Sequence, residues 1–587
     1  MLDPRIYRAA FLPVVFALVL VAFSLRDQPP GATTTLAPDA FDGTVALAQL
    51  DALAADAPVR TPGSAGGRRV ARSVEQALRA NGFDVRTRRF AAATTDGKQE
   101  VETVYGERTG FSSRRVVVVA QRDAVGRDAR AQLSGTATLM ELARVLGSRT
   151  LERTLVLASV SGGPAAARDL AEHAGGPVDA VLVLGDVAGT ETVRPLVVPW
   201  GDGPSTAPLQ LRRTVETALR AETGLAAGGA RPATQFARLA FPLTLGLQGP
   251  FLGDGIPAVL LSASGERPPA AAQEVSEARI EGFGRAVLRS MSALDAARDM
   301  PAPEAYVLLE RKLLPAWPIR LLGAVLLLPV LLASIDGFAR VRRRQEPVGR
   351  WLRWVGLCAL PFVLGVLLTI ALELTGLIAA SPPAPVAPEA VPRDGGALAA
   401  LAVVLVVIAL AWFLLRPFLA RLAGAPRDPS TPGAASAVML VLCAVAVVVW
   451  VVNPWTALLL VPALHLWLLA IAPETRLHPL GALALFLAGL VPPLLIAVSY
   501  LDQFGLDPLE LAWLGMLLVG GGGISLVAAL GWAVVLGCAG AVATIIVRQA
   551  LGEPPAPAGP GAPPSVRGPR TYAGPGSLGG TESALRR

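Results

Sequence analysis

The chain is poor in the residues that build disulfides and metal sites. Among its 587 residues are three cysteines and three histidines, and Cys358, Cys443 and Cys538 all lie in apolar segments. A disulfide framework in the polar part of the chain is therefore excluded, and so is a cysteine-based zinc site there. Lysine is scarce too, so the formal net charge of +7 comes from arginine. Because these arginines do not cluster with aromatic side chains, we expect no nucleic-acid partner.

Long apolar runs are abundant, and the chain is 53% hydrophobic. Residues 9–25 form one such run behind Arg5 and Arg8, with no small-residue cleavage site after it, which predicts a signal anchor. Further membrane spans are predicted near 318–337, 352–379, 397–416, 436–453, 455–472 and 480–500. The run 511–547 would reach roughly 55 Å as one helix, so we expect a break at Gly520–Gly523. It forms either two short spans or one span with a re-entrant piece, for a total of eight or nine.

The composition divides the chain into four parts. We expect an anchor helix in 1–29, an extracytoplasmic domain in 30–315, a domain of seven or eight spans in 316–548 and a disordered Pro/Gly-rich tail in 549–587. Arginine-rich segments at the N-terminus and at 339–354 predict a cytoplasmic N-terminus. The chain is thus expected to be a multi-pass protein of a bacterial plasma membrane, with the bilayer as one partner.

The polar part alternates buried strands with helices. Runs of β-branched residues at 116–120, 154–160, 180–185 and 256–262 predict strands, and helices are predicted at 135–147, 164–173 and 204–223. This order predicts an α/β fold with a mostly parallel sheet flanked by helices, beside an all-α membrane bundle. The functional loops should follow the carboxyl ends of the strands.

Several segments resemble, in order, those of the M28 family of zinc aminopeptidases across roughly residues 60–300. They are TPGSAGGRRV at 61–70, VVVVAQRD at 116–123, AQLSGTATLMELARVL at 131–146, TLVLASVSGGP at 154–164, VLVLGDVAG at 181–189 and GPFLGDGIPAVLLS at 249–262. The full layout is similar to the endoplasmic reticulum metallopeptidases and to the peptidase-like subunit of the GPI transamidase. The resemblance implies an M28-like outer domain, in which that family holds two zinc ions.

The zinc ligands that the resemblance implies are mostly replaced. Gln121 stands at the first histidine position, Ala131 at the bridging aspartate, and Gly162 and Gly163 at the Glu-Glu pair. No histidine follows Ser262, and His173, the single histidine of residues 30–315, falls near a helix end. Asp186 survives, with Asp123 in the supporting position.

Two divalent cations ~3.5 Å apart repel by roughly 19 kcal/mol at a dielectric of 20, so such a site needs several carboxylates. We therefore expect no catalytic residues and no metal cofactor, while Asp123 and Asp186 are expected to cap turns.

Three functions stay open from the sequence. The first is a catalytically degenerate, peptidase-like membrane protein, a pseudoenzyme that binds a peptide, a lipid-linked substrate or a partner protein. The second is an active membrane zinc aminopeptidase with displaced ligands, the one case in which zinc is expected. The third is a transporter gated by the outer domain, in which the intramembrane polar residues Glu373 and His465 carry function. If these two residues are only structural, we expect Glu373 to lie at the membrane interface and His465 to form a hydrogen bond with a neighbouring helix.

Overall fold

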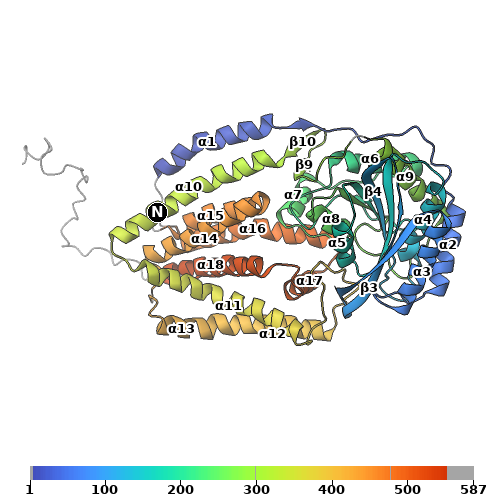
Figure 1. Ribbon diagram of the computed structural model, residues 1–587. Coiled ribbons are helices and arrows are strands. Elements are labelled where there is room, and N and C mark those ends of the chain that lie inside the picture. The colour runs from blue at the N-terminus through green and yellow to red at the C-terminus, as the bar shows by residue number, and fades with distance from the viewer. Residues whose placement is uncertain (1–3, 298, 427, 473, 476, 552–587) are drawn as a thin grey trace, which may run out of the picture.

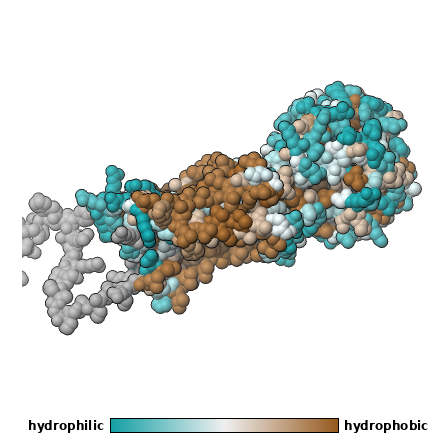
Figure 2. Space-filling model, turned by 90° about the horizontal axis from the view of Figure 1, so that it is seen from below, coloured by the Kyte–Doolittle hydropathy of each residue, from teal (hydrophilic) through white to brown (hydrophobic). Residues whose placement is uncertain are grey.

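The molecule has a polar α/β domain at one end and a bundle of long apolar helices at the other (Figure 1). The computed structural model describes residues 4–297, 299–426, 428–472, 474–475 and 477–551. The expected tail therefore lies, from residue 552 on, outside the described residues. A hydrophobic surface covers the bundle, whereas the outer domain is largely hydrophilic (Figure 2).

The outer domain contains these strands and helices: β1 (Arg26–Asp27), α2 (Gly43–Asp56), α3 (Ala65–Ala80), β2 (Asp84–Thr94), β3 (Gly97–Arg108), β4 (Ser112–Gln121), a 3-10 turn (Arg130–Leu133), α4 (Ser134–Leu146), β5 (Arg153–Val160), α5 (Pro164–Glu172), β6 (Val178–Leu184), β7 (Val197–Val198), α6 (Leu209–Thr223), α7 (Pro232–Ala240), α8 (Gln248–Gly253), β8 (Ala258–Leu261), α9 (Glu277–Ala296), β9 (Tyr306–Leu308) and β10 (Lys312–Pro315).

The central sheet has seven strands in the order β2-β3-β5-β4-β6-β8-β7. Its inner strands β5, β4, β6 and β8 are parallel, as the continuous apolar runs predicted. The prediction of a mostly parallel sheet is wrong for the flanks, because β2, β3 and β7 pair antiparallel. A two-residue turn at 95–96 joins β2 to β3, and their exposed faces carry the polar alternation that an antiparallel edge tolerates.

Helices cover both faces of this sheet. The chain passes from β4 through α4 to β5, and then through α5 back across β4 to β6. Because such crossovers are right-handed, α4 and α5 lie on opposite faces (Figure 1). The core between them includes Val118, Val119, Leu139, Leu142 and Leu157, all fully buried.

The bundle is built from α1 (Pro4–Phe23), α10 (Ala316–Arg343), α11 (Val348–Leu374), α12 (Gly395–Leu410), a π turn (Ala411–Leu415), α13 (Arg416–Leu422), α14 (Pro432–Val452), α15 (Pro454–Ile471), α16 (Pro479–Phe504), α17 (Pro508–Gly520) and α18 (Leu526–Leu551). Within the described residues, eight helices are long and apolar enough to cross a membrane, with α12 to α13 counted as one continuous helix. The run 511–547 breaks after Gly520, as expected. At 13 residues α17 reaches only about 20 Å, too short for a ~30 Å hydrocarbon core.

A small second sheet, in the order β1-β10-β9, links the two parts. β1 follows α1 directly and β10 precedes α10, and Arg26 pairs with Leu313 between them. The two helices therefore leave the sheet side by side, and α1 packs along α10 (Figure 1).

The outer domain and the bundle share a hydrophobic core where they meet. Leu239 and Ala240 of α7 pack with Trp455 of α15 and Phe504 of α16. Asn453 Nδ2 at the start of α15 donates to the carbonyl of Leu239 at 2.8 Å. The helix α7 is therefore buried by both parts.

Candidate functional site

A cavity of about 370 Å³ opens at the carboxyl ends of β4, β5, β6 and β8. Its floor consists of loops that follow these strands, and residues 382–390 of the segment between α11 and α12 line it from the side of the helix bundle. The site is therefore composite, since the outer domain and the segment between α11 and α12 of the bundle both line it.

The structure brings five of the six residues that the resemblance singled out to this cavity. Gln121, Asp123, Gly162, Gly163 and Asp186 all line it. Ala131 is fully buried in the 3-10 turn before α4, and its carbonyl accepts a hydrogen bond from Ser134 Oγ at 2.6 Å. Parallel strands place these residues together because their carboxyl ends meet at one edge of the sheet.

Asp186 has both carboxylate oxygens engaged. Oδ1 accepts from the backbone N–H groups of Ala188 at 3.1 Å and Gly189 at 2.7 Å, and Oδ2 accepts from Gln273 Nε2 at 3.1 Å. Burial raises the pKa of this carboxyl, and these hydrogen bonds oppose the rise. The geometry is that of an aspartate closing a turn onto its own backbone, which is how the residue acts in the fold.

Asp123 is also buried, with two arginines close by. Its Oδ2 accepts from the backbone N–H of Gly162 at 2.6 Å, whereas no donor among the described residues is in hydrogen-bonding geometry to Oδ1. Burial raises the pKa of Asp123, while the charge of Arg122 and, more weakly, that of Arg60 oppose the shift. Asp123 thus joins the loop after β4 to the loop after β5.

The backbone after β5 has a conformation that suits glycine. Gly162 has φ +96° and Gly163 has φ +58°. A Cβ on Gly162 would lie 3.0 Å from Cγ2 of Val101. A Glu-Glu pair here would be strained, because residues with side chains avoid positive φ.

A pair of zinc ions does not fit these residues. Gln121 offers a neutral amide, Ala131 and the two glycines offer no ligand atom, and the oxygens of Asp186 are already hydrogen-bonded. In the part of the chain that the structure describes, no three His, Cys, Asp or Glu side chains gather as a metal site.

The roof of the cavity is held from both sides, and we call residues 381–391 the strap. Arg267 Nε of the outer domain donates to Glu389 Oε1 at 2.8 Å, and Arg168 Nη2 donates to the carbonyl of Pro383 at 3.1 Å. On the side of the helix bundle, Trp513 Nε1 of α17 donates to the carbonyl of Val391 at 3.2 Å. The strap is therefore wedged between the cavity and α17.

The two polar residues of the apolar helices, Glu373 and His465, do not line the cavity. Glu373, in the last turn of α11, accepts from the backbone N–H of Ser381 at 3.1 Å and so fixes the start of the strap. His465 of α15 contacts the hydroxyl of Tyr7 in α1 at 3.3 Å and the carbonyl of Leu326 in α10 at 3.0 Å. These contacts fit a role in joining helices.

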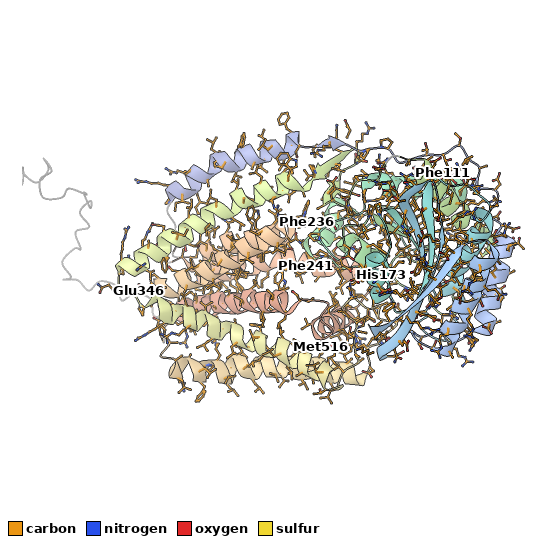
Figure 3. The ribbon with its side chains drawn as sticks, viewed as in Figure 1. Phe111, His173, Phe236, Phe241, Glu346 and Met516 are labelled. Atoms are coloured by element: carbon orange, nitrogen blue, oxygen red, sulfur yellow. The ribbon has the colours of Figure 1, made fainter. Side chains whose placement is uncertain are left out.

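His173 is remote from the cavity as well. It caps the end of α5, where its Nδ1 lies 2.7 Å from the carbonyl of Asp169 (Figure 3).

Sequence reasoning missed the strap, which the helix bundle contributes to the site. The strap contains SPPAPVAPEAV, in which frequent proline is a signal for an extended segment. Nothing in the local sequence indicates that this segment packs against the edge of the sheet, whose strands come more than a hundred residues earlier in the chain. Arg60 and Arg122, each almost fully buried beside Asp123, were missed as well because arginine is seldom buried.

The chain is similar over part of its length to several solved structures, among them zinc aminopeptidases and glutaminyl cyclases. A leucine aminopeptidase precursor from Bacteroides thetaiotaomicron is 13% identical, with 45% of this chain and 100% of that chain covered and a TM-score of 0.34. BSAP, a zinc aminopeptidase from Bacillus subtilis, is 12% identical, with 44% of this chain and 99% of that chain covered and a TM-score of 0.34. Porphyromonas gingivalis glutaminyl cyclase is 16% identical, with 43% of this chain and 99% of that chain covered and a TM-score of 0.32. No family model and no curated protein matches the chain.

Proposed function

We propose that the chain is a multi-pass membrane protein whose extracytoplasmic domain is a catalytically degenerate M28-like peptidase domain. Its cavity binds a peptide, a lipid-linked substrate or a partner protein without a metal ion. The N-terminus lies in the cytoplasm of a bacterial cell. The observation that carries the proposal is the cavity itself, which is retained at the strand ends although its ligand positions hold Gln121, Gly162 and Gly163.

The size and composition of the cavity support binding of a small part of a larger ligand. About 370 Å³ is near the lower limit of ligand pockets. Pro164, Leu247, Pro268 and Val386 supply apolar lining from four separate segments, whereas Gln121 supplies a free amide. One end of a peptide or a headgroup fits such a volume, with the rest of the ligand outside.

Peptidase activity of the full-length chain in detergent tests the proposal. The chain is incubated with aminoacyl and peptide substrates, with zinc or cobalt added, and Asp186→Asn serves as the matched variant. We expect no cleavage above that of the variant. Chelator-sensitive cleavage by the wild-type chain that Asp186→Asn abolishes would contradict the proposal and favour the active peptidase.

A further inference from the structure

The turn between α10 and α11 concentrates arginine at the end of the bundle away from the outer domain. Figure 3 labels Glu346 of this turn at that end. Five exposed arginines surround it, and we call them the arginine cluster: Arg342, Arg343, Arg344, Arg350 and Arg353. Among the described residues none of the five has a carboxylate partner, whereas the neighbouring Arg340 pairs with Asp336.

The helix ends explain only part of this cluster. Arg342 and Arg343 lie in the last turn of α10, where the helix dipole favours cations. Arg350 and Arg353 lie in the first two turns of α11, where the same dipole disfavours them. Glu346, the one acid of the turn, is half-buried with its carboxylate against Gly433. Among the described residues, the five arginines of the cluster therefore have no carboxylate partner in an ion pair.

Many arginines of the outer domain differ in this respect. Arg88 donates to Asp169 at 2.8 Å, Arg115 to Glu107 at 3.0 Å and Arg289 to Glu222 at 2.5 Å. These arginines of the outer domain thus form ion pairs within the fold, whereas those of the arginine cluster form none with the described residues.

The cluster lies beside side chains that face outward from the bundle. Ile335 of α10 is 49% exposed and Leu352, between Arg350 and Arg353, is 37% exposed. Behind the arginines, Trp351 and Trp354 are buried and meet edge to face with ring centroids 5.6 Å apart. Figure 2 shows hydrophilic surface bordering the hydrophobic belt at this end. The guanidinium groups therefore stand on a rigid base at the edge of the apolar surface.

We propose that the arginine cluster binds the phosphate groups of anionic phospholipids. A guanidinium group matches a phosphate with two parallel hydrogen bonds, and basic residues next to a membrane span are attracted to anionic lipid. A soluble acidic protein would neutralise the arginines but would not contact the adjoining apolar side chains. A phospholipid offers both, because its phosphate can bind the arginines while its acyl chains contact the apolar side chains.

The test compares the full-length chain in nanodiscs of phosphatidylcholine and of phosphatidylglycerol. Lipid affinity is measured by native mass spectrometry and by the shift in Tm. The cluster variant R342Q/R343Q/R350Q is paired with R72Q/R220Q/R231Q, which removes the same charge from exposed positions of the outer domain. Each arginine near an anionic surface contributes roughly fivefold, so the cluster variant should lose about a hundredfold in preference for phosphatidylglycerol.

The control variant should keep the preference of the wild-type chain, and added salt should weaken it. Equal loss in both variants would overturn the proposal, because it would reduce the effect to net charge. A cluster variant that keeps the full preference would overturn it too. Capture of an acidic soluble peptide without a phosphatidylglycerol preference would likewise overturn it and assign the cluster to a protein partner. The outcome does not depend on the function of the cavity.

Discussion

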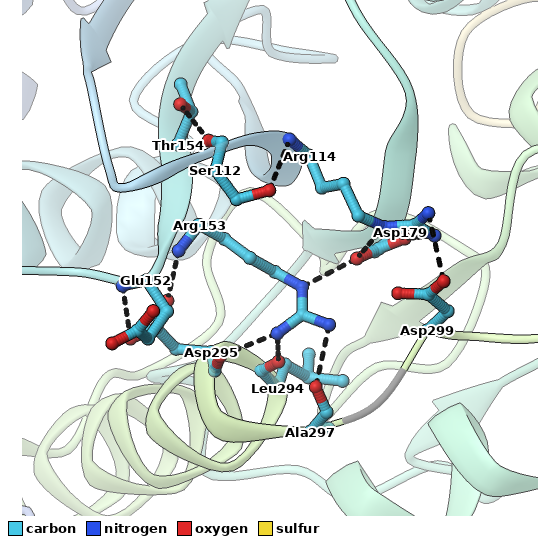
Figure 4. A network of polar contacts seen from close by, with 10 residues as sticks. All are labelled: Ser112, Arg114, Glu152, Arg153, Thr154, Asp179, Leu294, Asp295, Ala297 and Asp299. Atoms are coloured by element: carbon cyan, nitrogen blue, oxygen red, sulfur yellow. Dashed lines mark hydrogen bonds and ion pairs between the residues drawn. The ribbon is translucent and has the colours of Figure 1, made fainter.

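Single residues at the far edge of the sheet, away from the cavity, carry a buried network of charges (Figure 4). Arg153 Nε donates to Asp179 Oδ2 at 2.6 Å, and its other nitrogens donate to the carbonyls of Leu294 and Ala297 at the end of α9. Arg114 Nε donates to Asp179 Oδ1 at 2.8 Å. Burial alone would raise the pKa of Asp179, but the hydrogen bonds of the two arginines lower it below its ordinary value. The network ties three strands to α9.

Asp179→Asn should destabilise the outer domain strongly. The change leaves Arg153 without its charged partner, and breaking a buried pair costs about 3–5 kcal/mol. Asp84→Asn, in an exposed pair with Arg86, is the control and should cost less than about 1 kcal/mol. Because the pKa of Asp179 is lowered on folding, its contribution is present above the ordinary carboxyl pKa and is lost as the pH falls below it. Equal melting temperatures for the two variants would refute this.

Asp202, in the loop after β7, should give the opposite pH dependence. Burial raises its pKa to about 6, Arg168 opposes the shift, and Glu266 and Asp254 add to it. A raised carboxyl pKa favours the folded state at low pH, and this contribution is lost as the pH rises through about 6. Asp202→Asn should therefore stabilise the chain at pH 8 by about 3 kcal/mol and have little effect at pH 4. Melting curves at the two pH values check this, and an equal shift at both would count against it.

At the level of elements, the short helix α17 supports the strap. Leu517 and Trp513 of α17 pack with Ile378, Val386 and Val391 of the segment that leads over the cavity. After α17 the chain turns through glycines, of which Gly521 lies directly against the strap. An element too short to span a membrane thus has a defined role in positioning the roof of the site.

Gly521→Val should displace the strap. A Cβ at Gly521 would lie 2.7 Å from the carbonyl oxygen of Ser381 and 2.9 Å from that of Pro382, both of which are backbone atoms. Hydrogen exchange of residues 381–391 should rise by about tenfold or more, which corresponds to a loss of about 1.4 kcal/mol in local stability. Gly531→Ala in α18 is the control, because its Cβ meets no neighbour within 4 Å. If hydrogen exchange of residues 381–391 is unchanged in Gly521→Val, the contact of Gly521 after α17 does not position the strap.

At the level of the whole molecule, the outer domain and the bundle depend on each other. Phe236 of α7 meets Trp455 edge to face at 5.7 Å, and Phe241 packs on Trp532 at 5.1 Å. Arg238 pairs with Glu266 at 2.6 Å and lies over the ring of Phe504 at 4.7 Å. An interface with aromatic anchors and a buried ion pair resembles a domain core more than a flexible junction.

The isolated outer domain, residues 31–314, should therefore be a poor substitute for the full chain. Without the bundle the apolar face of α7 meets water, together with Phe236 and Phe241. Such a patch favours self-association. Size-exclusion chromatography with light scattering should show aggregates of the fragment, and the fluorescence of a hydrophobic dye should show that the dye binds it. The double substitution Phe236→Ser and Phe241→Ser should reduce both signals. A monomeric, dye-free fragment would show that the two parts are independent.

The sequence predicted much of this architecture, because its signals are local. The continuous apolar runs gave the four inner strands, and the length of 511–547 gave the break after Gly520. The resemblance to the M28 family singled out Gln121, Asp123, Gly162, Gly163 and Asp186, and these residues line one cavity. The strap could not be placed, because contacts between segments more than a hundred residues apart leave no periodic pattern.

Zinc content of the full-length chain, measured by mass spectrometry after purification in the presence of zinc, tests the central claim most directly. The account predicts less than one equivalent, with no difference between the wild-type chain and Asp186→Asn, because the carboxylate of Asp186 is already hydrogen-bonded within its own turn. Two zinc ions per chain that fall on substitution of Asp186 would contradict it. The cavity would then be a metal centre built from residues that we interpret as structural.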